Sequence, residues 1–139
     1  MLFVGIGGGI ELLQCSYFSR RAGAVIGLDV VDEMISACTE NLQMAERENA
    51  WFKRDFVDLR RGDALNLPIA DNSIGVAAQN CLFNIFHETD LTQALAEMYR
   101  VLKPHGRLIC PTRRASKRCR LRSRRTSVRA RSASLARSR

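Results

Sequence analysis

The stretch LFVGIGGGIELL, residues 2–13, decides the fold of this chain. Apolar residues run directly into a cluster of glycines, and helix-forming residues follow, so the stretch predicts a strand, a tight turn and a helix. A turn built on glycine brings bare backbone close to a ligand. The stretch therefore predicts a site for a phosphate, a dinucleotide or another nucleoside cofactor.

The spacing of the glycines separates these ligands. A phosphate-binding P-loop requires GxxxxGK[ST], and no Gly-Lys-Ser or Gly-Lys-Thr occurs in the chain. The dinucleotide pattern GxGxxG would place its third glycine at the position of Ile10. The pattern that fits is GxGxG, through Gly5, Gly7 and Gly9. Because any tight turn between a strand and a helix favours glycine, a purely structural turn stays open on this motif alone.

Length and composition limit the class of protein. The 139 residues suffice for one small domain. The sequence has no run of about 18 apolar residues and no basic N-terminal region followed by an apolar run, which favours a soluble, cytoplasmic protein without a membrane span. The five cysteines are odd in number and form no CxxC pair, which argues against a disulfide framework and a tetrahedral zinc site.

The net charge of +8 is divided unevenly along the chain. Residues 1–110 contain 10 Lys and Arg and 14 Asp and Glu, a charge of −4, whereas residues 111–139 contain 12 Lys and Arg and no acid, a charge of +12. The second segment is rich in Arg and Ser and has almost no large apolar residues, so we predict that it is disordered. Nucleic acid is therefore an expected partner only through this basic segment, and a salt-sensitive RNA-binding arm is the alternative for it.

Strands and helices alternate along the first segment. This order predicts an α/β domain over residues 1–110 with a mostly parallel sheet, whose ligands lie at the carboxyl ends of the strands. The predicted strands after the first are 23–30, 56–63, 73–83 and 107–110, and the predicted helices after the first are 31–49 and 88–106, the last closed by a Pro-Gly stop.

An acid ends the second predicted strand. Asp29 follows Gly9 by 20 residues, about the separation at which such an acid accepts hydrogen bonds from the two ribose hydroxyls of a nucleoside cofactor. The alternative is that Asp29 caps the helix that follows. Together with the glycines, Asp29 favours the cofactor interpretation.

Four segments in order resemble the class I S-adenosylmethionine-dependent methyltransferases. They are VGIGGG, IGLDVVDEMI, RRGDALNLPIADNSI and ALAEMYRVLKPHGRLI, and the resemblance covers residues 2–110. The segment AQNCLFNIF resembles the arsenite methyltransferases, in which an Asn-Cys pair at the end of the fourth strand presents a thiolate to trivalent arsenic. The resemblance implies a Rossmann-like fold and a small-molecule substrate, here arsenite as a thiol conjugate.

The resemblance also implies roles for individual residues. The glycines would let backbone approach the methionine part of S-adenosyl-L-methionine, Asp29 would hold the ribose, and Asp63 with the Ala64 backbone would read the adenine. Cys81 would be the catalytic arsenic ligand; a small buried hydrophobe is the alternative for this thiol. The implied cofactor-binding residues are Gly5, Ile6, Gly7, Gly9, Asp29, Val30, Asp63, Ala64, Gln79 and Asn80.

The sequence departs from the family pattern in several places. The family usually has an acid two residues before the first glycine, and Phe3 stands there, so we expect weaker cofactor binding. Relative to the family the domain is expected to be truncated at both ends, and an out-of-frame reading of a GC-rich coding region is our hypothesis for residues 111–139. Methylation of a small carbon, oxygen or nitrogen nucleophile and an inactive fragment remain the alternatives.

Overall fold

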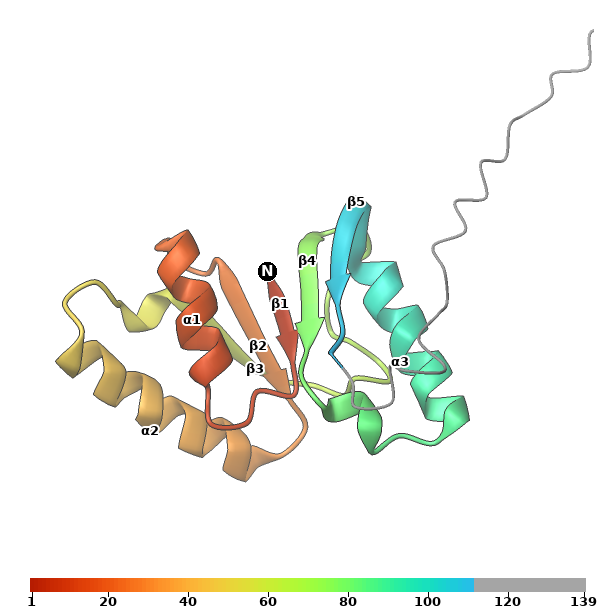
Figure 1. The fold of residues 1–139 in the computed structure, drawn as a ribbon, viewed down its shortest axis with the longest axis horizontal. Coiled ribbons are helices and arrows are strands. Elements are labelled where there is room, and N and C mark those ends of the chain that lie inside the picture. Colours follow the sequence, from red (N-terminus) through yellow and green to blue (C-terminus); the bar gives the residue numbers. More distant parts are fainter. Residues whose placement is uncertain (112–139) are drawn as a thin grey trace, which may run out of the picture.

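The computed structural model of the chain describes residues 1–111. The disorder predicted for the basic segment falls on residues that, from position 112 on, lie outside this range. Five parallel strands form one sheet in the order β3-β2-β1-β4-β5 (Figure 1). The strands are β1 (Leu2–Val4), β2 (Val25–Asp29), β3 (Val57–Arg61), β4 (Ile74–Gln79) and β5 (Leu102–Ile109), and the helices are α1 (Ile10–Ser19), α2 (Asp32–Glu48) and α3 (Glu88–Val101), with short 3-10 turns η1 (Arg54–Phe56) and η2 (Leu82–Asn84).

The helices cover both faces of the sheet, α1 and α2 on one and α3 on the other (Figure 1). Because successive side chains of a strand point to opposite faces, β1 contributes side chains to two hydrophobic cores, one on each face of the sheet. Leu2 and Val4 pack with residues of α3, whereas Phe3 packs with residues of α1 and α2. This arrangement confirms the predicted α/β, Rossmann-like fold with a mostly parallel sheet.

The last predicted helix and strand have different boundaries from those expected. Helix α3 ends at Val101, and β5 begins at once at Leu102. The expected Pro-Gly stop, Pro104 and Gly106, lies inside β5, where a register shift separates the pairs Ile74 with Leu102 and Val76 with Arg107. Proline disfavours helical conformation in the residue before it, so the chain leaves the helix early and the extra residues form an irregularity in the strand.

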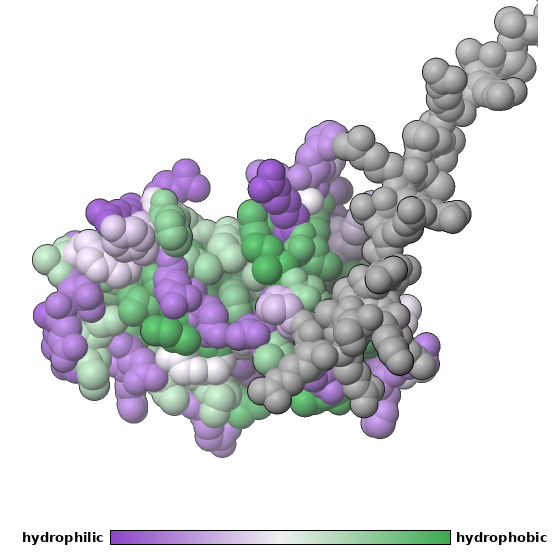
Figure 2. Space-filling view, in the orientation of Figure 1, coloured by the Kyte–Doolittle hydropathy of each residue, from purple (hydrophilic) through white to green (hydrophobic). Residues whose placement is uncertain are grey.

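Part of the sheet is open on the side of α1 and α2. In Figure 2 apolar surface is visible over β4 and β5. Leu108 and Ile109 of β5 are exposed, and β5 is the edge strand beside β4. Within residues 1–111 no helix is both long and apolar enough to cross a membrane.

An arginine of α3 fastens the loop between β3 and β4. Arg100 donates to the carbonyl oxygens of Leu67 and Ile69 and forms ion pairs with Asp71 and Glu97. Glu97 in turn accepts from the backbone N–H of Leu67. The network thereby fixes the loop that follows Asp63 to α3.

We expect Arg100→Ala to lower the free energy of unfolding by about 2 kcal/mol at neutral pH, since it removes several charge-assisted hydrogen bonds from a side chain that is 31% exposed. Hydrogen bonding to Arg100 lowers the pKa of Glu97. A lowered carboxyl pKa stabilises the fold above the unfolded-state pKa of about 4.3, and this stabilisation disappears as pH falls through the folded-state pKa.

Urea unfolding of both proteins at several pH values tests this prediction. The difference in the free energy of unfolding between the parent and Arg100→Ala should become smaller below pH 4. Arg47→Ala removes an exposed arginine of α2 and is the matched control. A difference that stays constant from pH 7 to pH 3 would contradict the assigned ion pair.

Candidate functional site

The predicted site residues lie at one edge of the sheet. In a parallel sheet the carboxyl ends of all strands meet there, and in Figure 1 the arrowheads point to the side that holds the turn after β1, the turn after β2 and η2. Backbone hydrogen bonds tie neighbouring ends together, from Gly5 N to Leu28 O and from Gly62 N to Asp29 O. The order β2-β1-β4 places the point at which the strand order reverses between β1 and β4.

The turn between β1 and α1 requires glycine for two different reasons. Gly5, Gly7 and Gly9 all have positive φ, at 78°, 50° and 89°. A Cβ on Gly9 would lie 2.7 Å from Cys38 Sγ, so this glycine is required by packing. A Cβ on Gly7 would meet nothing within 4 Å, so the Gly7 backbone borders open space. Such bare backbone is accessible to a ligand.

Asp29 connects the two turns nearest to it. Its Oδ2 accepts from the backbone N–H of Ile6 at 3.0 Å, and its Oδ1 accepts from the backbone N–H of Val31 at 3.0 Å. Helix α2 begins after Val31 with no side-chain cap, so Asp29 does not cap that helix, contrary to the alternative considered from the sequence. Each carboxylate oxygen retains a further lone pair, which leaves acceptors for two hydroxyl groups.

The remaining residues near Asp29 differ in what they offer a ligand. The Ile6 side chain is buried in the core of α1 and α2, so only its backbone faces the turn, whereas Val30 is exposed. Asp63 is exposed, and its Oδ1 accepts from the Leu65 N–H at 2.8 Å in a local turn. Ala64 is buried directly after it.

The two polar side chains at the end of β4 have different surroundings. Gln79 is buried, donates from Nε2 to Cys110 Sγ at 2.9 Å and accepts at Oε1 from the Phe83 N–H at 3.3 Å, so its amide stabilises the strand end from within. Asn80 is exposed and donates from Nδ2 to Glu11 Oε1 at 3.0 Å. Asn80 thus joins β4 to the first turn of α1.

Cys81 differs from the cysteines of the helices. Cys38 is buried, and burial raises its thiol pKa to about 11; burial also raises the pKa of Cys15, which is partly buried in α1. Cys81 is exposed, donates from Sγ to Asn80 Oδ1 at 3.3 Å and has φ 64°, a conformation that non-glycine residues rarely adopt. The alternative that Cys81 is a buried core residue is wrong.

Cys81 is not part of a cluster of metal-binding side chains within the described residues. Among residues 1–111 no three side chains of His, Cys, Asp or Glu gather closely enough to hold a metal ion.

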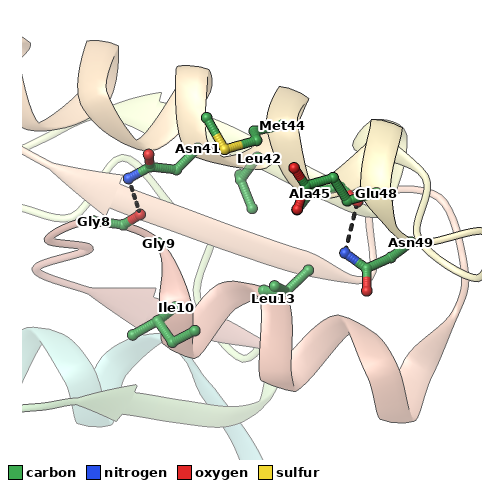
Figure 3. Close-up of a pocket in the computed structure, with 10 residues that line it drawn as sticks. All are labelled: Gly8, Gly9, Ile10, Leu13, Asn41, Leu42, Met44, Ala45, Glu48 and Asn49. Atoms are coloured by element: carbon green, nitrogen blue, oxygen red, sulfur yellow. Dashed lines mark hydrogen bonds between the residues drawn. The ribbon is translucent and has the colours of Figure 1, made fainter.

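A cavity of about 440 Å³ lies between α1 and α2 (Figure 3). Asn41 of α2 donates to the Gly8 carbonyl at 2.9 Å at one end of it. Ile10, Leu13 and Met44 line its apolar part. Gly9 of the glycine turn lines this cavity, whereas Asp29 and Cys81 do not.

The strand-end residues fit a nucleoside cofactor. The open Gly7 backbone follows β1, the oriented Asp29 carboxylate ends β2, and the exposed Asp63 carboxylate follows β3, and these three strands are neighbours in the sheet. Glycine-rich backbone and an acid after β2 define the class of Rossmann-like, nucleoside-binding α/β domains.

Comparison with known proteins identifies the family. Residues 2–110 match the methyltransferase domain family, and the chain belongs to it. The chain is 34% identical over 108 residues to an arsenite methyltransferase of Halobacterium salinarum and 37% identical over 92 residues to a demethylmenaquinone methyltransferase of Lactiplantibacillus plantarum. These alignments cover 78% and 66% of this chain but only 25% and 35% of the two relatives.

Solved structures agree on the fold. The YcgJ protein of Bacillus subtilis has 26% identity and a TM-score of 0.64, over 78% of this chain and 42% of that one. An arsenic(III) S-adenosylmethionine methyltransferase from Chlamydomonas reinhardtii shares the fold with a TM-score of 0.68 at 23% identity, over 77% of this chain and 36% of that one. Family and fold together support S-adenosyl-L-methionine as the cofactor of this chain.

Two residues of structural interest were not assigned from the sequence. The sequence identifies Glu11 only as a helix-forming residue, and it gives Arg100 no role of its own. Their partners, Asn80 and Leu67, lie 69 and 33 residues away in the sequence. No local pattern indicates contacts at such separations.

Proposed function

We propose that this chain is an S-adenosylmethionine-dependent methyltransferase domain that acts on trivalent arsenic bound to the Cys81 thiolate. The observation that carries the proposal is the position of Cys81, an exposed thiol in a strained backbone conformation directly after β4, at the same sheet edge as Asp29. Strained non-glycine residues concentrate at functional sites. The similarity to an arsenite methyltransferase supports arsenic as the substrate.

The residues present suit this chemistry. When bound, S-adenosyl-L-methionine supplies a methyl group activated by a positively charged sulfur. Arsenic(III) held by Cys81 and by the thiols of its conjugate carries its own lone pair, so the chain needs no general base. The chain's contribution is to bind both molecules at one sheet edge and to orient them.

A second candidate is methylation of a small carbon nucleophile. The similarity to demethylmenaquinone methyltransferases, at 36–38% identity, favours it. The same cofactor residues would serve this reaction, but Cys81 would have no role in it. The two candidates therefore differ in their dependence on this one sulfur atom.

We expect Cys81→Ser to reduce arsenite binding and methylarsenical formation at least tenfold, because a hydroxyl does not replace a thiolate as a ligand for a soft metalloid. The measurement is mass spectrometry of methylated arsenic after incubation with arsenite, glutathione and cofactor. Cys15→Ser, in which a partly buried helix cysteine is changed, is the matched control. Equal yields of methylated arsenic from Cys81→Ser and the parent would show that arsenic is methylated without this thiol, and the proposed role of Cys81 would fall. Cofactor binding by the parent without any methylated arsenic would favour a carbon, oxygen or nitrogen nucleophile or an inactive fragment.

A further inference from the structure

The partly buried carboxylate of Glu11 links the helix that follows the glycine turn to the end of β4. Glu11 follows Gly9 by two residues in the first turn of α1, and its Oε1 accepts from Asn80 Nδ2 at 3.0 Å. None of the ion pairs formed within residues 1–111 includes Glu11. Among the described residues, therefore, no cationic side chain pairs with this negative charge beside the glycine turn.

The other carboxylates of this edge are held differently. Asp29 accepts backbone N–H groups at both oxygens, and Asp63 accepts the N–H of Leu65. Phe3, which stands where the sequence pattern led us to expect an acid, is 5% exposed and packs in the core of α1 and α2. Glu11 is thus the carboxylate beside the glycine turn that binds a side-chain amide and no backbone N–H.

The cofactor carries positive groups that could pair with the Glu11 carboxylate. S-adenosyl-L-methionine carries an α-ammonium group and a sulfonium group, and a charged pair in a partly buried position gains more than one in free solvent. We infer that Glu11, oriented by Asn80, is the counter-charge that binds the α-ammonium of the cofactor. The inference depends on the cofactor assignment and is independent of arsenic as the substrate.

The substitution Glu11→Gln separates charge from structure. Glutamine keeps an oxygen that accepts from Asn80 Nδ2 but loses the negative charge, so the link between α1 and β4 survives. Glu40→Gln makes the same change at an exposed position of α2 and is the matched control. Thermal unfolding of both variants verifies that the fold is retained.

The test is calorimetric titration with three ligands. S-adenosyl-L-methionine has both cationic groups, S-adenosyl-L-homocysteine has only the ammonium, and methylthioadenosine has neither. We expect Glu11→Gln to weaken binding of the first two about tenfold and to leave methylthioadenosine unchanged, while Glu40→Gln binds all three like the parent.

Each other outcome overturns the inference in a distinguishable way. Unchanged binding of all three ligands by Glu11→Gln would show that the carboxylate has no cationic partner, although the cofactor assignment would stand. Weaker binding of S-adenosyl-L-methionine alone would place the carboxylate at the sulfonium. Equal weakening of methylthioadenosine would indicate a structural role. A parent chain that binds none of the ligands would remove the cofactor assignment and the inference with it.

Discussion

Asp29→Ala should lower the affinity for S-adenosyl-L-methionine at least a hundredfold. The side chain would supply acceptors to two ribose hydroxyls, and hydrogen bonds to a charged group contribute about 1.5–3 kcal/mol each. The same carboxylate holds the backbone N–H groups of Ile6 and Val31, so its loss also loosens the glycine turn. Both effects act on the cofactor site. Together they should lower the binding affinity more than the loss of either hydroxyl contact alone.

Calorimetric titration of the parent and of Asp29→Ala measures this effect. Asp55→Ala removes an exposed aspartate just before β3, at the opposite edge of the sheet, and controls for the loss of one negative charge. Asp29→Asn keeps one oxygen acceptor and should bind with intermediate affinity. A dissociation constant for Asp29→Ala within threefold of the parent value would exclude Asp29 from the site.

Gly9→Ala should lower the free energy of unfolding by about 3 kcal/mol. Gly9 has φ 89° at the start of α1, where an L side chain is strained by about 1–2 kcal/mol. The new methyl group would also lie 2.7 Å from the Sγ of buried Cys38, and crowding of this kind costs about 1–3 kcal/mol. Because small domains are marginally stable, this change removes a large fraction of the total free energy of unfolding.

Urea unfolding of a set of glycine variants separates the two contributions. Gly7→Ala has positive φ but open space around the new methyl group, so it should lose only the conformational part. Gly9→Ala combined with Cys38→Ala removes the crowded sulfur and should be more stable than the sum of the single changes predicts. A loss below 1 kcal/mol for Gly9→Ala would contradict the packing at this turn.

The local order of strands and helices could be predicted from the sequence because local signals carry it. Glycines after an apolar run, an acid at the end of the second run and helical spacing in residues 88–106 are all short-range patterns. The end of α3 was misplaced because Pro104 and Gly106 give the same local signal whether they end a helix or form an irregularity in a strand. The pairing of β5 with β4 decides between these two, and it is a contact between distant segments.

The sequence by itself determined the α/β class, the glycine turn and the acid that follows β2, since each depends on residues close together in the chain. Only the tertiary structure decided that Cys81 is exposed and strained, that Asp29 holds two backbone amides instead of capping α2, and that Glu11 meets Asn80. The physical reason is that a parallel sheet brings the ends of its strands to one edge whatever their separation along the chain. Charges and thiols acquire their chemistry from neighbours at that edge, and those neighbours are set by packing.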